Sequence, residues 1–152
     1  MVKIKIIKKA KERELVDINN LISQMSLTKV SPKHITMTEY KEMLNQEHLF
    51  FIVAVGKVSK NQEKIIGVLS VYFVKIPTGL IAWSEDLVID KPYRKWGVGR
   101  LLMEVGIKLA HQKRARHLSL RTNPVREEAN KLYQAMGFNL VETNFYRFNL
   151  FK

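Results

Sequence analysis

Residues Glu85–Gly106 read EDLVIDKPYRKWGVGRLLMEVG, and this stretch decides the fold class. It contains an apolar strand-like run, a short polar loop with two glycines, Gly97 and Gly99, and then apolar residues at helical spacing. Glycine lets a backbone approach a ligand closely. The free N–H groups and the dipole at a helix start favour an anion. The stretch therefore predicts a strand, a loop and a helix, with an anion site where the helix begins.

Three cations, Arg94, Lys95 and Arg100, lie at the same place, so a diphosphate would fit there. The alternative interpretation is a tight turn between a packed strand and helix, which two glycines also permit. The loop is neither of the GxxxxGK[ST] type nor of the GxGxxG type, because neither pattern is present.

The residues on both sides of this stretch alternate between strand-like and helix-like periods. We predict strands at Val2–Ile7, Leu49–Val58, Lys64–Lys75, Leu80–Ile89, His117–Arg121, Asn139–Val141 and Tyr146–Phe151, helices at Glu12–Met25, Thr38–Gln46, Gly97–Lys113 and Pro124–Met136, and a loop at Thr28–Pro32. Three consecutive strands form an antiparallel meander, and the helix after them makes the next strand parallel. The chain is thus predicted to be α/β, with one central mixed sheet.

Both ends of the helix predicted at Pro124–Met136 carry sequence signals. Asn123 fits the N-cap position, and Pro124 fits the first turn. Gly137 is placed to end the helix in the left-handed conformation, with Phe138 packing back on it.

The composition bounds the class of protein. The chain has 152 residues, 46% of them hydrophobic, and no cysteine, so we expect residues 1–152 to form a single domain. Disulfides, thiol nucleophiles and Cys-ligated zinc are excluded, and the four histidines show no metal-ligand spacing. Lysines interrupt the apolar residues at the N-terminus, and no apolar run is long enough to span a bilayer. We therefore expect a cytoplasmic protein without a metal ion or a membrane partner.

Positive charge is concentrated in one part of the chain. The net charge is +12, and residues 91–121 hold nine Lys or Arg and one acid, Glu104, a net +8. A phosphorylated cofactor or a nucleic acid would suit this field, whereas a solvated helix face is the alternative. No nucleic-acid-binding motif is present, so we do not expect a nucleic-acid partner.

Two motifs resemble those of the GNAT acyltransferase superfamily. Arg94-x-x-Gly97-x-Gly99 is similar to its [QR]-x-x-G-x-[GA] motif between a strand and a helix. The run from Ala129 to Phe138 is similar to its A-x-x-L-Y-x-x-x-G-F ending. The strand EDLVI and the run NPxRxxANxLY from Asn123 resemble one subset of that superfamily most closely.

The resemblance implies a fold and an activity. The fold is a central, mostly antiparallel sheet with one parallel, splayed strand pair, flanked by about four helices. The activity is N-acetyl transfer from acetyl-CoA, the co-substrate, to a primary amine that attacks the thioester directly. Residues Glu12–Leu49 would shape the acceptor pocket, and they carry no signature of the acceptor. A homodimer is common in the family.

The resemblance also implies roles for individual residues. Backbone amides of the loop would hold the CoA pyrophosphate, and an amide near Leu87–Val88 would polarise the thioester carbonyl. Tyr133 would protonate the CoA thiolate, although its spacing alone suits a core residue. The expected cofactor-binding residues are Leu87, Val88, Ile89, Arg94, Lys95, Trp96, Gly97, Val98, Gly99, Arg100, Asn123, Asn130 and Tyr133. Lys95 and Trp96 depart from the family pattern, which often has glycine after the arginine, and Trp96 would cover the cofactor, contact a partner or pack on the surface.

A carboxylate on the strand before the loop is the candidate general base. Glu85 and Asp86 are adjacent, so a regular strand points them to opposite faces. We favour Glu85, which would share a face with Trp83 and Leu87, and a structural carboxylate is the alternative. His34 is a weaker candidate for the base, and Tyr146 and Arg147 are weaker candidates for contact with the acceptor.

Two other functions compete with catalysis. One is an acyl-CoA-binding protein without turnover, and the other is a basic nucleic-acid-binding domain. Turnover with an amine panel separates the first from an enzyme, and a salt titration of binding identifies the second.

Overall fold

The computed structural model describes residues 1–25, 33–60 and 62–150, and the predicted loop Thr28–Pro32 lies outside them. Backbone contacts divide the chain into two compact units, Met1–Arg121 and Thr122–Lys152. Each unit is described by itself below. The prediction of a single domain stays a prediction.

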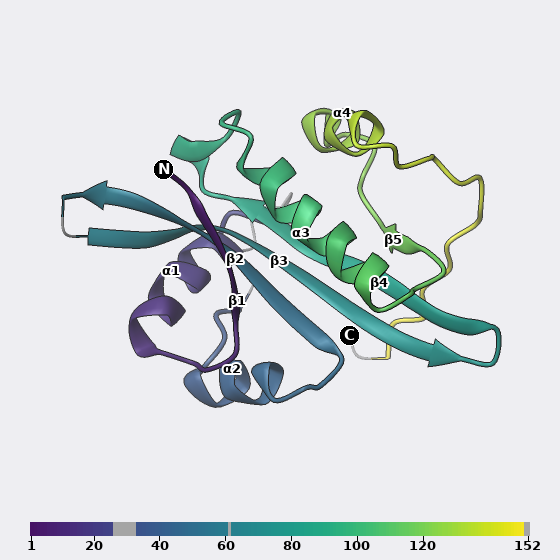
Figure 1. Cartoon of the computed structure of the whole chain (residues 1–152), viewed down its shortest axis with the longest axis horizontal. Helices are drawn as coiled ribbons and strands as arrows, with labels where there is room; N and C mark the ends of the chain where they lie inside the picture. The colour runs from purple at the N-terminus through teal and green to yellow at the C-terminus, as the bar shows by residue number, and fades with distance from the viewer. Residues whose placement is uncertain (26–32, 61, 151–152) are drawn as a thin grey trace. The chain divides into compact units, whose positions relative to one another are not determined.

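The first unit contains one five-stranded sheet (Figure 1). Its strands are β1 (Lys3–Ile7), β2 (Leu49–Ser59), β3 (Gln62–Ile76), β4 (Gly79–Ile89) and β5 (Leu118–Leu120), and they lie side by side in that order. The pairs from β1 to β4 are antiparallel, and β4 pairs with β5 in parallel. The predicted mixed sheet is confirmed.

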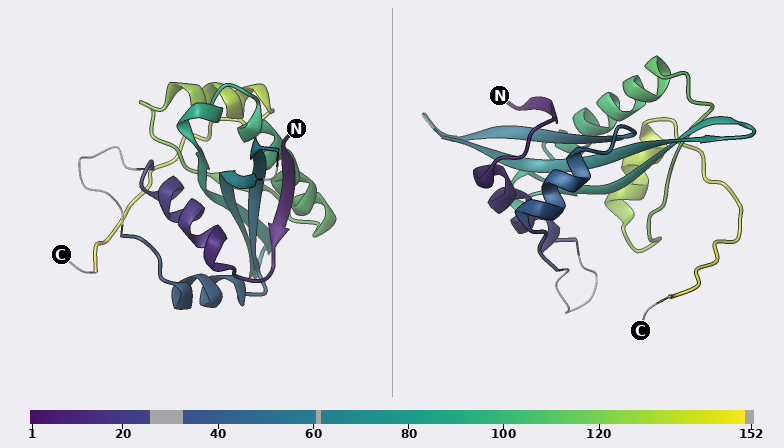
Figure 2. Two further views of the ribbon diagram at one scale, coloured as in Figure 1. Left: turned by 90° about the vertical axis from the view of Figure 1, so that its left-hand side faces the viewer. Right: turned by 90° about the horizontal axis from the view of Figure 1, so that it is seen from below.

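Helices cover both faces of this sheet. Figure 2 shows α1 (Glu12–Ile22) and α2 (Met37–Leu44) on one face and α3 (Val98–Gln112) on the other. The core under α1 and α2 includes Ile18, Leu21 and Tyr40 from the helices and Phe51 and Val68 from the strands.

A close approach fixes α3 on its face of the sheet. A Cβ added to Gly106 would lie 3.2 Å from Val71 and 3.4 Å from Leu69, so a larger residue would require these side chains to shift by a few tenths of an ångström. Leu102 and Met103 are fully buried beside it. The middle of α3 therefore packs closely on β3.

A capping box explains where α2 begins. The Thr36 hydroxyl accepts a hydrogen bond from the Glu39 N–H at 3.2 Å, and the Glu39 carboxylate accepts one from the Thr36 N–H at 2.7 Å. This reciprocal pair satisfies two N–H groups at the helix start.

The second unit contains α4 (Glu127–Ala135), which begins later than predicted. Asn123 is not its N-cap, because the Asn123 side chain accepts from the Val125 N–H at 3.0 Å and so builds a turn of its own. Arg126 occupies the N-cap position instead. This corrects the predicted start at Pro124.

The end of α4 is as predicted. Gly137 has φ 89°, its N–H donates to Gln134 O at 3.0 Å, and the Phe138 N–H donates to Tyr133 O at 3.0 Å. These are the two hydrogen bonds of a Schellman motif. The Phe138 ring packs on the Tyr133 ring with 5.9 Å between their centroids.

The predicted closing strands are wrong for the residues that the structure describes. Residues 139–150 contain no strand, and Phe151 lies outside the described chain. Leu140 and Phe148 are each 87% exposed. An apolar alternating pattern forms a strand only where a neighbouring strand pairs with it and a surface covers one face, and these residues have neither.

Candidate functional site

A short connection joins β4 to α3 and carries the glycines of the motif. It contains a 3-10 turn, η1 (Lys91–Tyr93). Gly97 occupies the N-cap position of α3 with φ 77° and ψ 3°, a left-handed conformation that glycine adopts without steric cost. An added Cβ there would meet no atom within 4 Å, so the conformation, and not lack of space, requires glycine. We call residues 91–100 the anion loop.

The anion loop exposes positive charge beside an uncapped helix start. The first turn of α3 has no side-chain cap and no acidic residue, and the first N–H groups of a helix lack partners within it. Four exposed cations lie in the anion loop: Lys91, Arg94, Lys95 and Arg100. The Arg94 Nε donates to Ile89 O at 3.0 Å, which folds that side chain back over the end of β4. The arrangement can hold a diphosphate.

An aromatic pair lies within the anion loop. Trp96 is 69% exposed, and its ring meets the Tyr93 ring edge to face with 5.7 Å between centroids. Lys95, which precedes it, has a positive φ of 67°. The loop therefore presents a large aromatic surface next to its cations.

A buried carboxylate anchors the loop where it leaves β4. Asp90 is 6% exposed, and its two oxygens accept from the Gln24 Nε2 at 2.9 Å and the Lys64 Nζ at 2.8 Å. Burial acts to raise the pKa of Asp90, but the bonds from Lys64 and Gln24 outweigh it and lower that pKa. Sequence analysis missed this cluster, because its members lie far apart in the chain and only Asp90 adjoins the motif.

The pairing of β4 with β5 ends before β4 does. The described register contains Ala82 with Leu118, Trp83 with Ser119 and Ser84 with Leu120, and no later pair. On its other side, β4 stays paired with β3 as far as Ile89. The register therefore contains no β5 partner for the edge of β4 that includes Leu87, Val88 and Ile89.

A β-bulge interrupts β4 just beyond its last pair with β5. Ser70 pairs with Glu85 and Val68 pairs with Val88, so Asp86 and Leu87 together oppose Leu69. Asp86 has a positive φ of 56°, which aspartate tolerates better than most residues. Because of the extra residue, Glu85 shares its face with Val88 and not with Leu87, which corrects the parity expected for a regular strand.

The bulge also affects the charge of Asp86. Asp86 is an exposed residue, and partial burial of its carboxyl, and secondly the charge of Glu85, raise the pKa of that carboxyl. A carboxylate with a raised pKa is a stronger base. Asp86 is thus a second base candidate beside Glu85.

Glu85 is engaged by a cation that sequence analysis did not connect to it. Arg121 forms an ion pair with Glu85, and its guanidinium lies 5.4 Å from the centroid of the Trp83 ring. Tyr72 pairs with Trp83 across the two strands. The hydrogen bond with Glu85, and then the Glu85 charge, raise the pKa of Arg121. One face of the sheet thus brings the Glu85 carboxylate, the Arg121 guanidinium and the rings of Tyr72 and Trp83 together at the bulge.

Tyr133 lies on α4 in the second unit. Burial raises the pKa of its hydroxyl, and the charge of Arg126 opposes this rise. The residue is half-buried, and its hydroxyl keeps its proton at neutral pH, as a proton donor must. Asn130, on the same helix, donates from its Nδ2 to Asn123 O at 3.1 Å and to Arg126 O at 2.9 Å, so its Oδ1 is the atom with which it could bind a donor group of a ligand.

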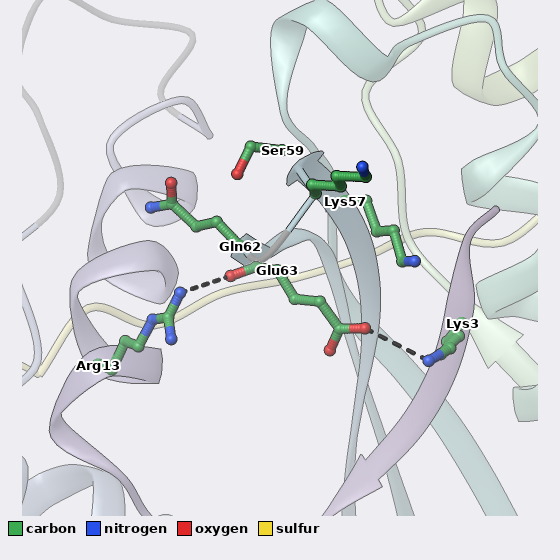
Figure 3. A pocket seen from close by; sticks show the side chains of 7 residues that line it. Lys3, Arg13, Lys57, Ser59, Gln62 and Glu63 are labelled. Atoms are coloured by element: carbon green, nitrogen blue, oxygen red, sulfur yellow. Dashed lines mark hydrogen bonds and ion pairs between the residues drawn. The ribbon is translucent and has the colours of Figure 1, made fainter.

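A pocket of about 400 Å³ lies elsewhere, at the tip of the β2–β3 hairpin (Figure 3). Its lining residues are Lys3, Arg13, Lys57, Ser59, Lys60, Gln62 and Glu63. Arg13 donates to Glu63 O at 3.0 Å, and Lys3 bonds the Glu63 carboxylate at 3.3 Å. Neither the anion loop nor β4 lines this pocket. The candidate site is therefore the anion loop, where the start of α3 without a side-chain cap coincides with the Arg94-x-x-Gly97-x-Gly99 motif.

Across residues 1–25, 33–60 and 62–150, no group of three or more His, Asp or Glu could hold a metal ion. In the same part of the chain, no helix combines the length and the apolar character that crossing a bilayer requires.

Comparisons with known proteins agree with the geometry. The profile of the acetyltransferase (GNAT) family matches residues 12–138. The chain therefore belongs to the GNAT acetyltransferase family, and it is a transferase. The family resemblance predicted from the two motifs is confirmed. No curated protein sequence matches the chain significantly.

Solved structures show the same fold at low identity. An acetyltransferase from Trypanosoma brucei is 19% identical, with a TM-score of 0.76 over 99% of this chain and 100% of that one. Glucosamine-6-phosphate N-acetyltransferase from Arabidopsis thaliana is 18% identical, with a TM-score of 0.75 over 97% and 98%. AAC(6′)-Iy, in complex with the bisubstrate analogue CoA-S-monomethyl-acetylneamine, is 19% identical, with a TM-score of 0.74 over 98% and 99%.

Proposed function

We propose that this protein transfers an acetyl group from acetyl-CoA to a primary amine. The observation that carries the proposal is the anion loop, where Gly97 holds a left-handed conformation at the uncapped start of α3 among exposed cations. The loop N–H groups from Arg94 to Arg100 hold the diphosphate of acetyl-CoA. The structure solved with a CoA-containing analogue supports this choice of donor.

The unpaired edge of β4 receives the pantetheine arm. Beyond Ser84 this edge has no β5 partner in the described register, so Leu87, Val88 and Ile89 bind an extended, amide-containing chain as a neighbouring strand would. The bulge turns backbone groups near Leu87 and Val88 out of the regular ladder. An N–H there polarises the thioester carbonyl. Trp96 covers the nucleotide end of the donor, and Asn123 and Asn130 bond its arm.

The chemistry needs one base and one acid. Acetyl-CoA supplies a thioester carbonyl carbon and a thiolate leaving group. Glu85 accepts a proton from the amine, through water, as the new N–C bond forms. Tyr133 donates its proton to the sulfur as the C–S bond breaks, and solvent restores both groups. The raised pKa of Tyr133 suits a donor that is protonated at neutral pH.

The acceptor amine, the oligomeric state and the location belong to the same proposal. No described contact selects one amine, and a homodimer is the assembly expected from the family. The lack of cysteine is compatible with a reducing compartment, so we place the protein in the cytoplasm.

Calorimetry with acetyl-CoA and the variant Gly97→Ala tests the donor site. Alanine at φ 77° is strained by about 1–3 kcal/mol and misdirects the loop N–H groups, so we expect affinity to fall about tenfold or more. Gly137→Ala is the matched control, because Gly137 also has a positive φ and open space around an added Cβ. Lack of binding to the unaltered protein would refute the proposal, and equal losses in the two variants would show that strain alone causes the effect.

Tyr133→Phe tests the acid, with release of CoA thiol in the presence of an amine panel as the readout. We expect turnover to fall about a hundredfold with little change in acetyl-CoA affinity. Unchanged turnover would exclude Tyr133 as the acid. Binding without turnover for any amine would identify a non-catalytic acyl-CoA-binding protein.

Glu85→Gln and Asp86→Asn, compared in the same assay, identify the base. The residue that acts as base loses about a hundredfold in turnover when its carboxylate is removed. We expect this for Glu85. The larger loss in Asp86→Asn would transfer the role to Asp86, which the bulge makes more basic.

A further inference from the structure

We infer that Gln24 is a positioning residue that couples the C-terminal end of α1 to the anion loop. This inference rests on the proposed function, because it concerns how the loop is held for acetyl-CoA. It follows from one side chain that bonds two consecutive residues at the start of the loop.

The Gln24 amide makes a two-point contact. Its Nε2 donates to the Asp90 Oδ1 at 2.9 Å, and its Oε1 accepts from the Lys91 N–H at 3.1 Å. The backbone of Gln24 continues the end of α1, with its N–H donating to Leu21 O at 2.9 Å. Two bonds from one planar group fix direction as well as distance. The position of Gln24 after α1 therefore sets the direction in which the loop leaves β4.

Asp90 is fixed on every side. Its second carboxylate oxygen accepts from Lys64 at 2.8 Å, its N–H donates to Ile66 O at 2.9 Å, and its carbonyl accepts from the Tyr93 N–H at 2.8 Å. The Asp90 side chain is 8% exposed. Lys91 is therefore the first residue of the loop beyond a fully bonded anchor, and Gln24 holds its N–H.

Charge alone would not place a carboxylate here. A negative group at the base of an anion site repels a diphosphate, and Lys64 offsets that charge with its own. Electrostatics predicts that removal of the Asp90 charge tightens acetyl-CoA binding. Positioning predicts that it weakens binding, because Asn cannot keep both bonds with the same geometry.

The coupling is reciprocal. If the end of α1 orients the loop, then a ligand that orders the loop also orders the end of α1. Bound acetyl-CoA should therefore slow amide hydrogen exchange at Gln24 and Met25, whose N–H groups close the last turn after α1.

The test compares Gln24→Met with Gln112→Met. Methionine has a similar length and no charge, and it removes both bonds from Gln24 to the loop as well as a long one, of 3.4 Å, from its Nε2 to Asn20 O. Gln112 is exposed at the opposite end of α3. We expect Gln24→Met to weaken acetyl-CoA binding, and to raise KM for acetyl-CoA, about tenfold, the scale of two lost hydrogen bonds. We expect little change in kcat. Gln112→Met should bind as the unaltered protein does.

Amide hydrogen exchange and a second variant, Asp90→Asn, distinguish a positioning role of Gln24 from a general loss of structure. Saturating acetyl-CoA should slow hydrogen exchange of the amides at residues 24 and 25 in the unaltered protein. In Gln24→Met, saturating acetyl-CoA should leave the exchange of these amides unchanged. Asp90→Asn should weaken binding as well. Unchanged affinity in Gln24→Met, tighter binding in Asp90→Asn, or protection that persists would each overturn the inference. The proposed function would survive those results, whereas it fails if the unaltered protein does not bind acetyl-CoA or binds it without turnover of any amine.

Discussion

Asp86 carries two local costs at once. It has φ 56° within a strand, and burial and the neighbouring Glu85 raise the pKa of its carboxyl. Strain and unfavourable charge at one residue are common where function requires a particular geometry. The bulge at Asp86 is thus a cost in stability that accompanies the shape of the β4 edge.

Asp86→Asn should therefore stabilise the protein at neutral pH. The raised pKa means that the folded state binds the Asp86 proton more tightly than the unfolded state does, so ionisation reduces stability as pH rises above 3.8, the ordinary value. Asparagine removes the charge and tolerates a positive φ. Thermal unfolding should show a higher Tm for the variant at pH 7 and a smaller difference as the pH approaches 3.8. A lower Tm at pH 7 would contradict this account.

The starts of α2 and α4 differ in whether a nearby side chain bonds the first turn of the helix. The Thr36 and Glu39 side chains define the start of α2 by bonds within four residues, as a capping box does. The start of α4 depends on a turn in which Asn123 bonds Val125 and not the helix. Two residues of types that favour the N-cap position, Thr36 and Asn123, therefore produced a helix start in one segment and a separate turn in the other.

The loss of stability on removal of the α2 capping box should depend on pH. Thr36→Ala should cost about 1 kcal/mol of unfolding free energy, whereas Thr38→Ala, inside the helix, should cost less.

Backbone and side-chain bonds from Thr36 and Lys33 lower the pKa of Glu39 from 4.5 to about 2. Glu39→Gln should therefore destabilise the protein above pH 4.5, and its effect should fade as pH falls from 4.5 to 2. Chemical denaturation across this range measures both effects, and a loss independent of pH would argue against the ionised cap.

The charge of the whole molecule has consequences beyond the loop. A net charge of +12 attracts any polyanion at low salt. Acetyl-CoA, in contrast, is proposed to bind through backbone N–H groups as well as charge. The two modes of binding should differ in their dependence on salt.

Binding to a DNA oligonucleotide should fall at least about a hundredfold between 50 and 200 mM salt, because counterion release governs it. Acetyl-CoA affinity should fall less than about tenfold over the same range. Fluorescence anisotropy and calorimetry measure the two. Oligonucleotide affinity that persists at 200 mM salt would favour the basic domain as a nucleic-acid-binding protein.

The sequence by itself determined the order of strands and helices from Lys3 to Ala135, the anion loop and the family. These features depend on local properties: periodicity, the φ that Gly97 and Gly137 permit, and motif spacing. The left-handed conformations at Gly97 and Gly137 were therefore predictable without knowledge of any distant contact.

Only the tertiary structure decided the partners of the polar residues and the fate of the last segment. The bulge at Asp86 changed which side chains share the Glu85 face, because register depends on pairing with β3. Gln24, Lys64 and Asp90 meet across 26 to 66 residues of chain. Residues 139–150 have a strand-like pattern and no strand. In each case the outcome depends on which distant group lies alongside, and a local pattern of residue types carries no record of that neighbour.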